Sequence, residues 1–187
     1  MVRLGDICEI VSGSTPSTSN EILWKGNIKW ITPAEITNDS YFIMDTERHI
    51  SELARLKLMP SGTVLLTSRA PIGKVAIAGV EMCCNQGFKN FICSDHIQNR
   101  YLYYFLKSKK DYLNSLGRGA TFKEVSKNIV EEIKIPLPST KEQKSIADIL
   151  DKLVQLTTLH KKRLIKMNLL VKSRFVTSGM QVSEVVI

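Results

Sequence analysis

Residues 135–175 read IPLPSTKEQKSIADILDKLVQLTTLHKKRLIKMNLLVKSRF, and this stretch decides how the chain is organised. Ile135-Pro136-Leu137-Pro138 is expected to be an extended connector, because proline lacks a backbone N–H and disfavours a helical residue before it. Ser139 and Glu142 have the spacing of a capping box, in which each side chain satisfies a free amide at a helix start. No glycine or proline lies between Ser139 and Ser178. We therefore predict one long helix over residues 138–175.

The predicted helix carries a seam of apolar residues. From Ile146 to Phe175 the seam positions are separated by 3, 4, 3, 4, 4, 3, 4 and 4 residues, a heptad-like pattern with extra residues inserted. A helix of about 35 residues is roughly 50 Å long, so part of the seam is expected to need another chain. The alternative is a shorter helix folded back onto the rest of the chain. The predicted pairing interface, with His160 as a polar seam residue, is Ile146, Ile149, Leu153, Leu156, His160, Leu164, Met167 and Val171.

Residues 1–137 are predicted to form one α+β domain of mixed helices and strands. The turn formers Pro60-Ser61-Gly62 and Arg69-Ala70-Pro71-Ile72-Gly73 separate short β-type runs. The predicted strands are Ile28–Ile31, Thr63–Thr67, Lys74–Ala78, Phe88–Ile92 and Glu132–Leu137. A single helix that ends at Gly117 is predicted from the spacing of Leu102, Phe105, Leu106, Leu113 and Leu116. Leu4–Val11 fits either a short helix or a strand, and residues 176–187 are expected to be a tail.

Charge and composition bound the function classes. The net charge of +8 makes an acidic partner plausible, although many mildly basic proteins bind none. The four cysteines, Cys8, Cys83, Cys84 and Cys93, form no Cys-x-x-Cys pair and lie far in sequence from the histidines, which argues against a zinc site. The first residues lack the apolar run of a secretory leader, and no apolar stretch is long enough to cross a membrane. We expect a cytoplasmic protein with reduced thiols.

The motifs that catalysis would require are missing from the sequence. There is no glycine-rich loop for a methyl donor and no phosphate-cradling Gly-x-x-x-x-Gly-Lys-Ser/Thr segment. Asn85-Gln86-Gly87-Phe88 lacks the prolines of an amino-methyltransferase tetrapeptide. Glu142 and Lys144 have a spacing found in metal-dependent nucleases, but an acidic residue at a helix start is explained by the helix dipole. We expect no catalytic residue, no metal site and no cofactor.

Binding is the function that remains. Arg and Lys can neutralise phosphates or bond guanine edges, and Gln can pair with adenine. Residues of these types, together with hydroxyl and aromatic residues, are concentrated in turns and loops. The candidate DNA-binding residues are Thr15, Trp24, Lys25, Thr32, Arg69, Lys74, Gln86, Lys89, Arg118, Thr121 and Lys123.

Seven segments, in order along the chain, resemble the specificity subunits of type I restriction-modification systems. They are Ser12-Gly13-Ser14-Thr15-Pro16-Ser17, Trp24-Lys25-Gly26, Trp30-Ile31-Thr32-Pro33, Leu65-Leu66-Thr67-Ser68-Arg69-Ala70-Pro71-Ile72-Gly73, Asn85-Gln86-Gly87-Phe88, Gly119-Ala120-Thr121-Phe122-Lys123-Glu124-Val125-Ser126 and Ile135-Pro136-Leu137-Pro138. The resemblance implies a target-recognition domain that reads one half of a bipartite double-stranded DNA site. It also implies a spacer helix that forms an antiparallel coiled coil and holds methyltransferase (modification) subunits, and through them a restriction subunit. Catalysis would then lie on those other chains.

The chain departs from the family pattern in carrying one recognition domain and one spacer helix where typical members carry two of each. It is either a natural half-subunit or a truncated product. A half-subunit is expected to pair with a second copy, or with a different half, and to rebuild the two-domain layout. Two other hypotheses stay open: a helix-mediated assembly or decoy protein that occupies methyltransferase subunits without reading DNA, and a free-standing nuclease.

Overall fold

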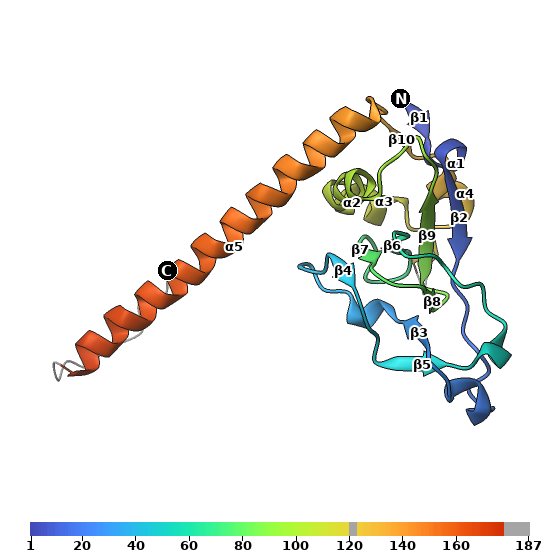
Figure 1. The fold of residues 1–187 in the computed structure, drawn as a ribbon, viewed down its shortest axis with the longest axis horizontal. Helices are drawn as coiled ribbons and strands as arrows, with labels where there is room; N and C mark the ends of the chain where they lie inside the picture. Colours follow the sequence, from blue (N-terminus) through green and yellow to red (C-terminus); the bar gives the residue numbers. More distant parts are fainter. Residues whose placement is uncertain (120–122, 178–187) are drawn as a thin grey trace. The chain divides into compact units, whose positions relative to one another are not determined.

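The computed structural model describes residues 1–119 and 123–177, with side chains up to Arg174. The chain divides into two units, Met1–Ala147 and Asp148–Ile187. Figure 1 gives the order of the elements along the chain. The strands are β1 (Val2–Arg3), β2 (Cys8–Ser12), β3 (Ile28–Ile31), β4 (Phe42–Ile43), β5 (Arg48–Ile50), β6 (Val64–Thr67), β7 (Val75–Ala78), β8 (Met82–Cys84), β9 (Phe88–Cys93) and β10 (Lys134–Ile135). The helices are α1 (Leu4–Ile7), α2 (Asn99–Ser108), α3 (Lys110–Leu116), α4 (Lys127–Glu131) and α5 (Thr140–Thr177), with short 3-10 turns η1 (Glu21–Trp24), η2 (Pro33–Glu35) and η3 (Glu52–Ala54).

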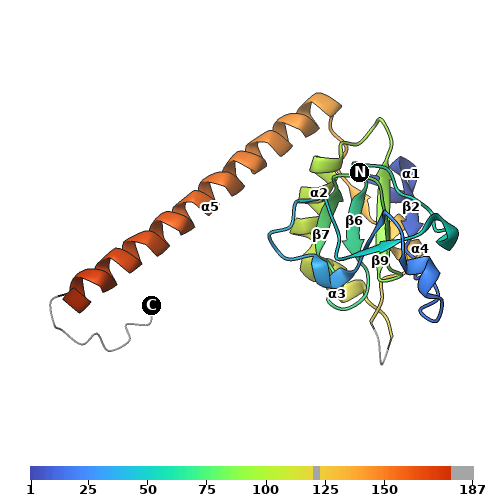
Figure 2. The ribbon, with the colours of Figure 1, turned by 60° about the horizontal axis from the view of Figure 1, so that its bottom comes forward.

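The first unit is built around a five-stranded sheet in the order β2-β9-β6-β7-β4. A three-stranded sheet, β5-β3-β8, packs on one face of it, and α2 packs against β6 and β7 on the other (Figure 2). Successive side chains of a strand point to opposite faces, so Val64 and Leu66 of β6 enter the core with the helices while Leu65 enters the core between the sheets. The central strands are therefore apolar on both faces. This burial confirms the prediction of an α+β fold from short apolar runs.

The strands predicted at the centre of the sheets are confirmed, whereas several shorter elements of the structure differ from the prediction. Ile28–Ile31 is β3, and the runs at 63–67, 74–78 and 88–92 contain β6, β7 and β9. The undecided segment at 4–11 holds both α1 and the start of β2. The strand predicted over 132–137 is only Lys134–Ile135, because Pro136 follows and supplies no amide for pairing. Sequence patterns did not reveal β2, β4, β5, β8 and α4 as separate elements.

The single helix predicted to end at Gly117 is wrong, because the structure has two helices there. The chain leaves helical geometry at Lys109 (φ −102°, ψ 17°), which separates α2 from α3. Leu106 of α2 and Leu113 of α3 both lie in the same core. Gly117 does cap the end of α3, in an extended conformation (φ −61°, ψ 130°).

Helix α5 begins where the capping box predicts. Ser139 Oγ donates to Glu142 Oε2 (2.6 Å), and Glu142 N donates back to Ser139 Oγ (3.3 Å). The helix runs without a break through 38 residues, so the alternative of a shorter helix is wrong. Its first two turns belong to the first unit, ten residues beyond the predicted boundary at 137. The buried amide of Gln143 explains this extension, because it donates to the carbonyls of His96 and Pro138 (both 2.9 Å).

Candidate DNA interface

The loop that follows β2 is held tightly against the turn after β8. Gly13 lies so close to this turn that an added Cβ would stand 1.9 Å from the carbonyl oxygen of Asn85. The next residue, Ser14, donates its amide to the Cys84 carbonyl (2.8 Å). Two indoles hold the loop from its other side: Trp30 donates to the Ser14 carbonyl (3.0 Å) and Trp24 to the Ser17 carbonyl (3.1 Å). Both tryptophans thus form part of the frame that positions this loop.

Asn85 organises the next turn and joins it to the loop. Its Oδ1 accepts from Gly87 N (2.7 Å), and its Nδ2 donates to Thr15 Oγ1 and to Gln86 Oε1 (both 3.0 Å). The Thr15 hydroxyl also donates to Gln86 Oε1. Gln86 is exposed, so its amide NH₂ is presented at the surface by these neighbours. The candidate residues Thr15 and Gln86 therefore meet, and Asn85, which was not among the candidates, connects them.

Two further segments lie beside this turn. Ser68 N donates to the Gly87 carbonyl (2.7 Å), and Val125 N donates to the Ser68 carbonyl (2.9 Å). Arg118 and Glu124 exchange backbone hydrogen bonds (3.0 and 2.9 Å). Residues 12–17, 68–69, 85–88, 118–119 and 123–126 thus form one hydrogen-bonded surface, and all of them except Arg118 lie in segments quoted for the resemblance.

One carboxylate connects two of these segments with strand β9 through ion pairs. Glu124 Oε2 lies 2.8 Å from Arg69 Nε, and Oε1 lies 2.9 Å from Lys89 Nζ. The Lys89 side chain is 6% exposed and that of Arg69 is 46% exposed. Partial burial raises the pKa of Glu124, but the hydrogen bonds and charges of Lys89 and Arg69 outweigh it and hold this pKa below its ordinary value. Glu124 stands in a quoted segment, but sequence alone offered no sign of its partners.

The remaining candidates lie around this surface in different environments. Lys89 is buried with its ammonium on Glu124, so it supports the surface from within and is not available for the direct DNA contact predicted for it. Thr32 is committed to the capping box of η2 with Glu35. Exposed Lys25 is 3.6 Å from Glu21. Arg118 and Lys123 are exposed and Lys74 is half-buried, whereas Thr121 lies outside the described residues.

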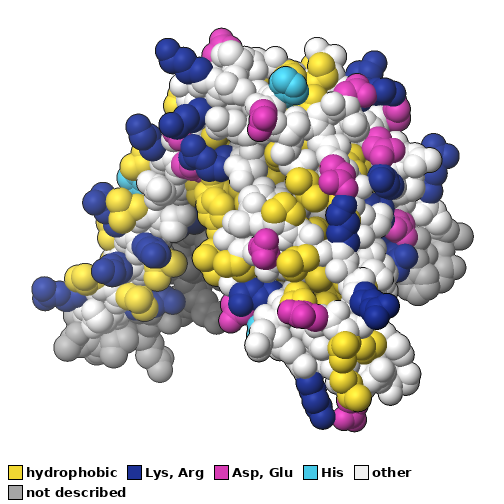
Figure 3. Space-filling model, turned by 45° about the vertical axis from the view of Figure 1, so that its right-hand side comes forward, with side chains coloured by type: hydrophobic (Ala, Val, Ile, Leu, Met, Phe, Trp, Pro, Cys, Tyr) yellow, Lys and Arg dark blue, Asp and Glu magenta, His cyan; other side chains and the backbone are white. Residues whose placement is uncertain are grey.

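More of the net positive charge lies on α5 than on the residues that precede it. Residues 1–139 hold 17 Lys and Arg against 14 Asp and Glu, a net +3, whereas residues 140–177 hold nine against three, a net +6. The face in Figure 3 accordingly mixes basic and acidic side chains. The net charge of the chain therefore comes mainly from α5 and is weak evidence for DNA binding by the candidate interface.

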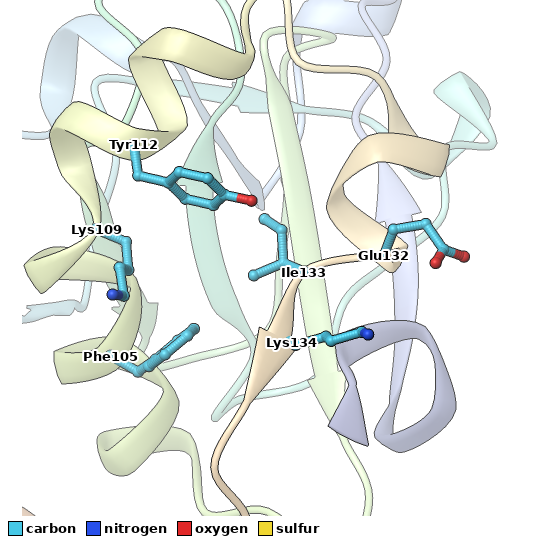
Figure 4. Close-up of a pocket in the computed structure, with 6 residues that line it drawn as sticks. All are labelled: Phe105, Lys109, Tyr112, Glu132, Ile133 and Lys134. Atoms are coloured by element: carbon cyan, nitrogen blue, oxygen red, sulfur yellow. The ribbon is translucent and has the colours of Figure 1, made fainter. Parts of the chain in front are cut away.

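The first unit also has concave features. Two cavities of about 380 Å³ each adjoin α3 and share Tyr112, Glu132 and Ile133. Tyr112 and Ile133 face each other across the first of them (Figure 4). Of the candidate residues that the structure describes, Arg118 alone lines one of these two cavities. Within 1–119 and 123–177 no group of His, Cys, Asp or Glu has the arrangement of a metal site, and no helix is long and apolar enough to span a membrane.

Gly13→Ala is expected to disrupt this surface, because the new methyl group would collide with the Asn85 backbone. Backbone atoms cannot move as the end of a side chain can, so we expect a loss of about 2 kcal/mol or more in the free energy of unfolding. Urea unfolding followed by tryptophan fluorescence measures it. Gly5→Ala, where the Cβ would come no closer than 3.0 Å to the Glu131 side chain, is the comparison. An unchanged midpoint for Gly13→Ala would contradict the tight packing described.

The α+β fold and this polar, exposed surface are features of a binding domain. The chain belongs to the family described as the type I restriction modification DNA specificity domain, which it matches over residues 1–169. Specificity subunits are the non-catalytic components of type I restriction systems, and this chain carries their domain.

Two named relatives illustrate this membership. The chain is 45% identical over 155 residues to the specificity subunit of the type I restriction enzyme MjaIX of Methanocaldococcus jannaschii, covering 79% of this chain and 36% of that protein. It is 31% identical over 165 residues to the EcoR124I/EcoR124II specificity subunit of Escherichia coli, covering 82% and 40%. The chain therefore spans well under half the length of these relatives.

Solved structures share the fold. A chain of a type I R-M system, solved to describe complex assembly and conformational transition, has a TM-score of 0.73 at 25% identity over 92% of this chain and 42% of its own length. The HsdS subunit from Thermoanaerobacter tengcongensis has a TM-score of 0.68 at 24% identity over 87% and 38%.

Proposed function

We propose that this chain reads one half of a bipartite DNA target through the surface formed by residues 12–17, 68–69, 85–88, 118–119 and 123–126. The observation that carries the proposal is the hydrogen-bonded convergence of these segments around Asn85 and Glu124. The convergence presents Gln86, Arg69 and Arg118 at one exposed surface. A planar amide and guanidinium groups on a rigid frame are suited to base edges in a major groove. Side chains that are held in fixed positions can distinguish one DNA base from another by the pattern of donors and acceptors on its edge.

We further propose that the seam of α5 pairs with the seam of a second copy. Seam residues such as Leu153 (53%), Leu164 (60%) and Met167 (64%) are exposed in the single chain. Charge favours an antiparallel pair: residues 152–174 carry seven Lys and Arg and no Asp or Glu, whereas residues 140–151 carry three acidic and two basic residues. A parallel pair would place the two basic stretches side by side, and an antiparallel pair brings each one toward the acidic end of its partner.

The helix offers a second apolar stripe for methyltransferase subunits. At 3.6 residues per turn, Val154, Ile165 and Leu169 lie roughly 140° around the helix from the centre of the seam. All three are exposed. Lys161 and Lys172 fall on the same side of the helix as this stripe. Its chemistry fits a helix of the modification subunit that carries apolar and acidic residues.

The proposed function predicts a symmetric methylation pattern. In cells that hold a type I modification subunit, adding this chain is expected to create methylation at a palindromic bipartite motif, because two copies would read identical half-sites. Sequencing of methylated bases with and without the chain measures it, and Arg69→Ala is expected to weaken the signal.

A control and the contrary outcomes complete this test. Arg55→Ala changes an exposed arginine outside the proposed surface and should leave methylation intact. Co-purification with the methyltransferase and no new motif would instead indicate an assembly or decoy protein. A non-palindromic motif would refute self-pairing and indicate a different half-subunit.

A further inference from the structure

Arg48, at the start of β5, is stacked on an aromatic pair that the sequence did not connect with it. Its guanidinium carbon lies 3.6 Å from the ring centre of Trp24 and 5.3 Å from that of Trp30. The two rings meet edge to face, with centres 4.9 Å apart. Arg48 is also the cross-strand partner of Trp30 in the β3–β5 pair. The stack is therefore determined by strand register as well as by side-chain contact.

This arginine is held in place but is not neutralised. Arg48 is exposed, and no carboxylate forms an ion pair with it in the part of the chain that the structure describes. The nearby Asp45 instead pairs with Lys29 (3.3 Å) and His49 (3.2 Å). Stacking occupies the face of a guanidinium and leaves its in-plane N–H groups free to donate. A side chain ordered in advance also loses less entropy on binding.

The stack adjoins the surface proposed to read DNA. Trp30 donates its indole N–H to the Ser14 carbonyl, and the next residue, Thr15, bonds the Asn85 and Gln86 side chains. Arg48 is therefore linked through Trp30 to the loop that contains Ser14 and Thr15, and Thr15 contacts Gln86.

We propose that Arg48 is a further base-reading residue, whose in-plane N–H groups bond O6 and N7 of a guanine, and that Trp24 is its positioning residue. This inference rests on the proposed function. A phosphate would accept a lysine in place of arginine, whereas the paired acceptors of guanine match the fork of a held guanidinium. Trp24 fixes the orientation of the Arg48 guanidinium, and a fixed orientation favours recognition of the paired acceptors of a guanine.

Selection of bound duplexes from a random pool tests the inference, with a type I modification subunit that binds the chain present. The wild-type motif is expected to contain a guanine whose preference falls about tenfold or more in Arg48→Gln. Arg48→Lys should lose the same preference. Trp24→Leu should lose it too, and Trp24→Phe, which keeps a ring beneath the guanidinium, should retain most of it. Thermal unfolding of each variant identifies any loss caused by misfolding.

Arg55→Gln is the matched control, because Arg55 is exposed, follows η3 and is expected to leave the motif unchanged. An identical motif for wild type and Arg48→Gln overturns the inference alone. An equal loss of affinity for all sequences, rescued by Arg48→Lys, also overturns it, since it indicates a phosphate contact. If the wild type itself selects no motif, the proposed function fails and the inference fails with it.

Discussion

Glu124→Ala is expected to lower the free energy of unfolding by about 3 kcal/mol, because it leaves the ammonium of Lys89 buried without a counter-charge. Lys89 Nζ lies 2.9 Å from Glu124 Oε1 and also donates to Ser68 Oγ at 3.4 Å. The value is at the low end for a broken buried pair, since the Glu124 side chain is 31% exposed and water can reach the site. Urea unfolding at pH 7 measures the change.

Two comparisons separate this effect from the loss of any surface charge. Glu132→Ala removes a carboxylate that pairs with Arg3 but is 65% exposed, so it should cost about 1 kcal/mol or less. Adding Lys89→Met to Glu124→Ala should restore part of the stability, because the uncompensated charge is removed with its partner. Equal losses for Glu124→Ala and Glu132→Ala would mean that Lys89 is solvated and that the pair does not hold the surface together.

Leu164→Lys is expected to raise the dissociation constant of the self-paired chain by about 100-fold or more. Each pair would lose two seam leucines, whose burial is worth about 1.5–3 kcal/mol apiece, and would place two further charges in a basic stretch. Sedimentation velocity over a range of concentrations measures the dissociation constant.

Leu169→Lys is the matched control for this change. The two leucines are equally exposed, 60% and 61%, but Leu169 lies on the second stripe and not in the seam. It should leave self-pairing unchanged and weaken capture of a modification subunit. If both variants dissociate alike, the pairing face is not the seam; if Leu164→Lys stays paired, self-pairing does not depend on α5.

The elements that were predicted correctly depend on residues close in sequence. A capping box spans four residues, a helical seam repeats within a few turns, and a buried strand shows as a short apolar run. These local signals located the start and course of α5 and the strands β3, β6, β7 and β9. They failed at Lys109, where a non-helical backbone conformation separates α2 from α3 within an apolar pattern that suits one continuous helix.

The sequence by itself determined the class of the protein: an α+β recognition domain, a long apolar-seamed helix and the family to which the ordered segments point. Only the tertiary structure decided which residues make the candidate interface. Asn85 meets Thr15 across 70 positions, Glu124 meets Lys89 across 35, and Arg48 rests on Trp24 through strand register. Such contacts follow from the path of the whole chain, which no short window of sequence contains. They turned Lys89 from a predicted DNA contact into an internal support, and they connected Arg48 to the surface that is proposed to read DNA.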